Sequence, residues 1–187
     1  MSRATWSALF VALTVSGCGS PGARSAAAPP ADEHLTLVTS GASNQLKLEG
    51  RELFGPRLNV SFYDDGYRGS YDLHYMVDLR ASGADKIVGS IAGQPTDLTI
   101  EEGPSWLRVH GLYKGRVSSF VFTSRRLQGM IGDCSYLLRT TQGDPETYFG
   151  GRACTGGSGG TRLTLPDAFE ERSARDRVVA LALLLGG

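Results

Sequence analysis

The sequence predicts an all-β fold, an antiparallel meander that closes into a small barrel or a sandwich, with a helix at its C-terminal end. Apolar and polar residues alternate with a period of two over many short segments, which gives a strand one apolar and one polar face. Glycine is abundant, at 25 of 187 residues, and turn-forming residues separate the alternating segments. Both observations favour short strands that are joined by tight turns.

The alternating segments lie within residues 35–165, which we expect to form one β domain. Leu58–Phe62 and Tyr71–Leu79 alternate from end to end, so each is expected to be a single strand. Further short apolar segments lie at Lys86–Ile91, Leu98–Ile100, Trp106–Leu112, Arg116–Ser124, Leu127–Ile131 and Tyr148–Arg152. About a dozen such strands favour a barrel, because closure removes exposed strand edges.

Residues 166–187 have the features of a C-terminal helix. Pro166 suits the first helical position, and Asp167 and Glu170 suit a helix N-terminus. Val178–Leu185 is an unbroken apolar run of eight residues, which is too short to cross a bilayer. We therefore expect a terminal helix that packs over the barrel, the alternative being an interface for a partner or for the bilayer surface.

The first 17 residues have the features of a signal peptide. Arg3 gives a short positive start, and residues 4–15 form an apolar run that lacks charge. Val15–Ser16–Gly17–Cys18 resembles the lipobox of bacterial lipoproteins, a resemblance that covers these 18 residues only. It implies that Cys18 carries lipid and becomes the mature N-terminus. The alternative is an ordinary secretory signal with a chance cysteine.

Residues 18–34 are mostly small, bear prolines and are expected to be a flexible tether. Gly19 stands where many lipoproteins of this class carry the aspartate that retains them at the inner membrane. The resemblance therefore implies a lipid-anchored location in the cell envelope, with the outer membrane favoured if the source is Gram-negative.

The charge of the exported chain argues against nucleic acid as a partner. Removing residues 1–17 takes away one arginine, which leaves 18 basic and 19 acidic side chains and a formal charge of −1. Nucleic-acid binding requires a clustered positive excess. The expected partners are the membrane, reached through the lipid anchor, and an envelope protein or an apolar ligand.

Cys134 and Cys154 are predicted to form a structural disulfide. They are an even pair in an exported chain. Folding the intervening sequence about Asp144–Pro145 pairs Tyr136 with Arg152 and places the two cysteines opposite each other. A redox pair or a metal site is the alternative, but the chain has no CxxC spacing.

Ser158 is the one candidate nucleophile. Gly156–Gly160 matches the letters of the G-x-S-x-G elbow, which needs a strand before it and a helix after it. Here we expect a glycine-rich loop within β sequence, so the match is attributed to composition. His74 and His110 fall on the polar faces of predicted strands and are expected to be solvated, so no catalytic residue is predicted.

No metal or cofactor site is predicted either. Three histidines are too few to assemble a zinc site with the available ligands. Asp64–Asp65–Gly66 lacks the ligand spacing of a calcium loop and is interpreted as a turn. Glu101 and Glu102 are adjacent on a predicted strand, so their side chains should point to opposite faces.

Four aromatic residues near predicted turns are the candidates for a ligand or partner surface, with core packing as the alternative. They are Tyr63, Tyr67, Trp106 and Tyr113.

The function expected from these observations is non-enzymatic binding of an envelope protein or an apolar ligand. A structural or assembly role is one alternative, and an envelope serine hydrolase built on Ser158 and a histidine is another. A small barrel with a terminal helix is similar in outline to lipocalin-like proteins. None of that family's sequence motifs is present, so the likeness assigns no residue a role.

Overall fold

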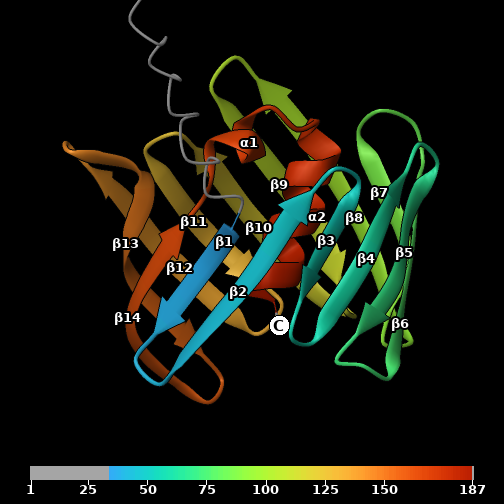
Figure 1. Ribbon diagram of the computed structural model, residues 1–187, viewed down its shortest axis with the longest axis horizontal. Helices are drawn as coiled ribbons and strands as arrows, with labels where there is room; N and C mark the ends of the chain where they lie inside the picture. The colour runs from blue at the N-terminus through green and yellow to red at the C-terminus, as the bar shows by residue number, and fades with distance from the viewer. Residues whose placement is uncertain (1–33, 187) are drawn as a thin grey trace, which may run out of the picture.

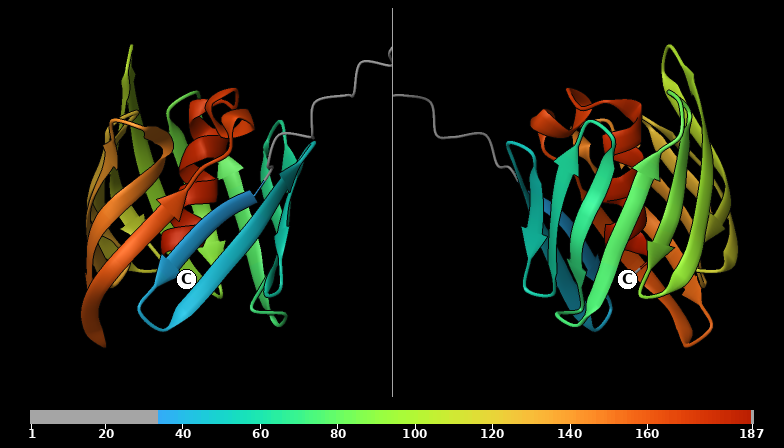
Figure 2. Two further views of the ribbon diagram at one scale, coloured as in Figure 1. Left: turned by 60° about the vertical axis from the view of Figure 1, so that its left-hand side comes forward. Right: turned by 90° about the vertical axis from the view of Figure 1, so that its right-hand side faces the viewer.

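The computed structural model describes residues 34–186 and forms, over these residues, a closed antiparallel barrel of fourteen strands with a helix inside (Figures 1 and 2). The predicted all-β fold is confirmed, and it is a barrel. The strands are β1 (His34–Thr39), β2 (Ala42–Glu49), β3 (Glu52–Gly55), β4 (Leu58–Tyr63), β5 (Gly66–Tyr71), β6 (Tyr75–Ala81), β7 (Lys86–Ile91), β8 (Gln94–Gly103), β9 (Trp106–Tyr113), β10 (Arg116–Thr123), β11 (Arg126–Ile131), β12 (Cys134–Thr141), β13 (Asp144–Cys154) and β14 (Gly157–Thr164).

Each strand pairs with the next strand in the sequence, and β14 pairs with β1 to close the barrel. The closing register places Leu37 of β1 opposite Leu163 of β14. We call the end at which β1 begins and β14 ends the near end of the barrel. The opposite end, with the turns at residues 40–41, 114–115, 132–133 and 155–156, is the far end.

Two helices follow the last strand, α1 (Asp167–Glu170) and α2 (Ala174–Leu185). The segment 166–187 is thus divided, and the predicted packing of the helix over the barrel is wrong. Figures 1 and 2 show α2 running down the inside of the barrel, and it contacts β1, β2, β8 and β9.

The sequence and the strand number together explain the position of α2. Every residue of Val178–Leu185 is at most 2% exposed, and a helix that is apolar on all sides must be buried on all sides. Eight strands enclose an interior that side chains alone can fill. Fourteen strands enclose a wider space, which a helix can fill. Each fully buried leucine contributes about 1.5–3 kcal/mol.

Polar contacts hold the start of α2 at the near end. Ser173 is the N-cap, and its hydroxyl accepts a hydrogen bond from the backbone N–H of Asp176 at 3.2 Å. The hydroxyl of Tyr67 donates to Oδ1 of Asp176 at 2.9 Å and joins the helix to β5.

The end of α2 is held at the far end. The hydroxyl of Tyr136 donates to the carbonyl of Leu185 at 2.6 Å, and Nζ of Lys114 donates to the carbonyl of Gly186 at 3.5 Å. Both donors reach carbonyls at the end of the helix, where intrahelical partners are lacking. A Cβ at Gly186 would lie 2.3 Å from Cε1 of Tyr113, so only glycine fits there.

Two further local predictions are wrong. Tyr71–Leu79 is not one strand, because a turn separates β5 from β6 and contains Asp72 and Leu73 at φ values of 54° and 64°. The expected glycine-rich loop 156–160 is also shorter than predicted, since β14 already begins at Gly157.

Candidate functional site

The predicted disulfide is confirmed. Cys134 and Cys154 are opposite each other in the β12–β13 register and are bonded, with Cα atoms 4.1 Å apart. The predicted pairing of Tyr136 with Arg152 is also present. The bond joins the inner faces of β12 and β13 at the far end of the barrel, where it has a structural role. Cys18 lies outside the described residues.

The four aromatic candidates do not form one surface. For Tyr67 and Tyr113 the alternative of core packing is correct, because their side chains are only 2% and 1% exposed. Tyr63 is 49% exposed at the near end. Trp106, also at the near end, is half-buried beside Arg108, whose guanidinium lies 5.3 Å from the ring centroid.

Buried tyrosines surround the helix, and their pKa values are raised. Desolvation is the main cause for Tyr67, Tyr113, Tyr136 and Tyr148. For Tyr67 the carboxylate of Asp176 raises the pKa further. These hydroxyls are therefore uncharged, and those of Tyr67 and Tyr136 donate hydrogen bonds to α2.

The structure does not assemble a catalytic site around Ser158. Ser158 is exposed and lies opposite Ala153 on the outer face of β14, which continues as a strand. His74 lies in the β5–β6 turn, and His110 is on the outer face of β9 with its Nδ1 atom 3.9 Å from Glu101. Within residues 34–186, no hydrogen bond joins Ser158 to either histidine.

The paired carboxylates are separated as predicted. Glu101 contacts Arg108 at 3.1 Å on the outer face, and Glu102 contacts Arg177 of α2 at 2.8 Å. Across the described part of the chain, no group of three or more His, Cys, Asp and Glu side chains could hold a metal ion.

A row of exposed apolar side chains crosses the outer surface of β9–β13, one from each strand. This outer apolar row consists of Leu112, Val117, Met130, Leu137 and Phe149, which are 37–72% exposed. Leu112 and Val117 are directly opposite each other in the register. The later members follow as diagonal neighbours, within reach of long side chains.

Three arginines lie on the outer surface of the same sheet region. Arg126 is directly opposite Arg139, Arg139 is opposite Phe149, and Phe149 is opposite Arg162. We call Arg126, Arg139 and Arg162 the arginine row. All three are exposed, and none forms an ion pair with the residues that the structure describes. Like charges placed directly opposite are unfavourable, so an anionic partner would stabilise this row.

The two halves of the barrel carry opposite charge. Residues 34–105, which include β1–β8, have six basic and ten acidic side chains, whereas residues 106–165, which include β9–β14, have eight basic and three acidic ones. The balanced total of the chain conceals a net charge of −4 on one half and +5 on the other. The arginine row and the outer apolar row are both on the basic half.

Sequence analysis missed this surface because its members are separated by irregular spacings. Arg126, Arg139 and Arg162 become neighbours only through the strand register. The charge difference between the halves could have been found by counting charges over successive segments.

Side chains of α2 occupy the centre of the barrel. Among residues 34–186, no helix has the length and apolar character needed to cross a membrane. Comparison with protein-family models, curated proteins and solved structures finds no match to this chain.

Proposed function

We propose that the protein is a lipid-anchored envelope protein that binds an acidic partner protein through the outer face of β9–β14. The arginine row carries this proposal, because three exposed arginines in register lack carboxylate partners within the described residues.

The outer apolar row supports a protein as the partner. A protein interface has an apolar centre and a polar rim, and aromatic residues, methionine and arginine are enriched in it. Phe149 joins the two rows, because it lies between Arg139 and Arg162 and is 41% exposed. Leu137 and Met130 extend the apolar surface from it. We expect Phe149 to contribute most to the binding energy.

The occupied interior supports a surface site over an apolar ligand inside the barrel. Leu181, Leu183, Leu184 and Leu185 occupy the centre of the barrel, and each is at most 2% exposed. An apolar ligand in the centre of the barrel would have to displace a helix that is held at both ends by hydrogen bonds.

The test begins with a photoreactive amino acid at position 149 in cells of the source organism, which traps the neighbouring protein. Binding of the purified partner is then measured against salt concentration with the Arg139→Glu and Arg80→Glu variants. Arg80 is an exposed arginine on the acidic half and serves as the matched control.

We expect Arg139→Glu to weaken binding at least tenfold and Arg80→Glu to leave it unchanged. Added salt should weaken binding of the unmodified protein, because exposed charges are screened. A partner that binds equally well after Arg139→Glu, or without dependence on salt, would contradict the proposal.

A further inference from the structure

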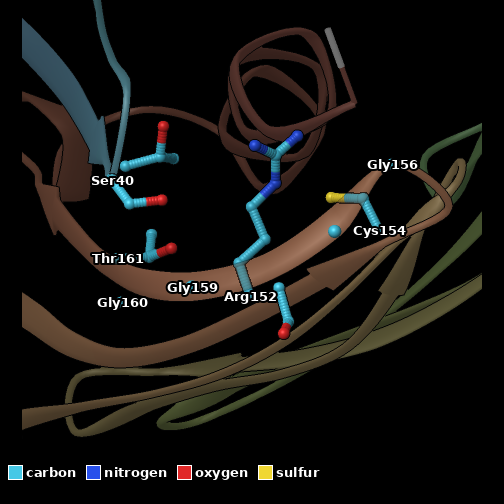
Figure 3. A pocket seen from close by; sticks show the side chains of 10 residues that line it. Ser40, Arg152, Cys154, Gly156, Gly159, Gly160 and Thr161 are labelled. Atoms are coloured by element: carbon cyan, nitrogen blue, oxygen red, sulfur yellow. The ribbon is translucent and has the colours of Figure 1, made fainter.

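A polar cavity opens at the far end of the barrel, where the inner face of β14 lacks side chains. Gly157 and Gly159 occupy inward positions next to Arg152 of β13, and the missing side chains leave a cavity of about 400 Å³. Figure 3 shows Arg152 pointing toward the helix, with Ser40 and Thr161 on one side and Cys154 on the other. The glycine-rich segment thus forms the wall of a cavity.

Two residues of the cavity wall each have a buried polar atom without a hydrogen-bond partner among the described residues. The atoms are Nε of Arg152 and Oγ1 of Thr161. Thr161 is only 6% exposed. Buried polar side-chain atoms in folded proteins nearly always have a hydrogen-bond partner, so two unpaired atoms in the wall of one cavity indicate that a ligand supplies the missing partner.

The charge of the cavity selects an anion. Arg152 contacts the sulfur of Cys134 at 3.1 Å and the ring of Tyr136 at 5.9 Å from its centroid, and neither contact neutralises a guanidinium. Among residues 34–186, no carboxylate side chain lines the cavity. A guanidinium and a nearby hydroxyl provide the donors that bind carboxylate or phosphate oxygens.

A second cavity of about 320 Å³ adjoins the first and shares Thr39 and Arg152 with it. Its wall is largely apolar and includes Leu37, Leu46 and Leu58 of the barrel. Leu183 and Leu184 of α2 complete the apolar wall. The only charged side chain in this wall besides Arg152 is Arg57, which forms an ion pair with Asp72.

We infer that the far end of the barrel binds a small amphiphilic oxyanion. Its anionic oxygens contact Arg152 and Thr161, and its short apolar tail packs against the leucines of the second cavity. This site is separate from the arginine row on the outer face, so either one can fail without the other.

The experiment follows the Nε–H resonance of Arg152 by NMR while acetate, hexanoate or inorganic phosphate is added to the purified protein. We expect a saturable shift with hexanoate. Hexanoate should bind on the order of tenfold or more tightly than acetate, because each buried methylene adds favourable transfer energy. The phosphate titration distinguishes a carboxylate site from a phosphate site.

Variants assign the contacts. Arg152→Gln should abolish binding, and Thr161→Val should weaken it on the order of tenfold while leaving thermal stability unchanged or higher, since it removes an unpaired hydroxyl. Gly159→Ala places a Cβ 2.7 Å from Oγ of Ser40 and should block the cavity. Gly151→Ala on the outer face, where a Cβ meets open space, is the matched control.

The absence of any saturable shift with all three anions would overturn the inference. So would an unchanged affinity in the folded Thr161→Val and Arg152→Gln variants. Equal affinities for acetate and hexanoate would overturn the assignment of the tail.

Discussion

Replacing Tyr136 with phenylalanine should loosen the end of α2 and lower the stability of the whole barrel. The substitution removes one hydroxyl, which donates at 2.6 Å to the carbonyl of Leu185 in a buried position. That carbonyl has no intrahelical partner, so it would remain buried and unsatisfied. The expected loss in the free energy of unfolding is about 1–3 kcal/mol. This corresponds to a fall in Tm of roughly 2–10 °C for a chain of this size.

Tyr113 provides the matched control at the same end of the helix. It is 1% exposed, and its hydroxyl has no hydrogen-bond partner among the described residues. Tyr113→Phe should therefore leave stability unchanged or raise it by up to about 1 kcal/mol. Urea denaturation measures both variants, with equal m-values as the sign that the folded state is preserved. If Tyr113→Phe is as destabilising as Tyr136→Phe, the assigned contacts at the helix end are wrong.

Four further outcomes are expected. The buried tyrosines have raised pKa values in the folded protein, so their contribution to the free energy of unfolding is fully present below about pH 10. Above that pH it falls by up to about 1.4 kcal/mol per pH unit for each tyrosine. Urea midpoints that stay constant into the alkaline range would refute this. Replacing both Cys134 and Cys154 with serine should lower stability by about 3 kcal/mol through loss of the closed loop, and an unchanged denaturation curve would argue against it. Cys18→Ala should abolish fatty-acid labelling in cells, whereas equal labelling would show that the lipobox resemblance is misleading. Ser158→Ala should change neither stability nor complementation of a deletion strain, and a fluorophosphonate probe that labels the unmodified protein at Ser158 would revive the hydrolase.

Local sequence patterns predicted the strands and one cross-strand register. The alternation in Leu58–Phe62 matches the start of β4, and Lys86–Ile91 matches β7. Folding the chain about Asp144–Pro145 placed Cys134 opposite Cys154, as the structure confirms. These predictions succeeded because side-chain alternation and turn residues are local properties.

Alternation failed where a turn residue happened to be apolar. Leu73 continues the alternating pattern of Tyr71 and Tyr75, yet it lies in the left-handed region at φ 64° and is 68% exposed. A non-glycine residue in this region is uncommon, so nothing in the local sequence signals the turn.

Properties that depend on the whole barrel were beyond local reasoning. The position of α2 follows from the width of a fourteen-strand barrel, which no single segment reveals. The arginine row exists because Arg126, Arg139 and Arg162 come into register across β11–β14. The cavity beside Arg152 exists because inward positions of β14 are glycines, which requires knowing which face of the strand points inward.

If α2 fills the barrel, binding is restricted to the outer surface and the far end. Amide hydrogen exchange of Val178–Leu185 measures whether the helix is enclosed. If the helix is enclosed, these amides should be among the slowest in the protein. They should also exchange with the same free energy and urea dependence as the central strand amides, because only global unfolding exposes them. Exchange of the helix amides at much lower free energy, while the strands stay protected, would show that α2 is not enclosed by the barrel.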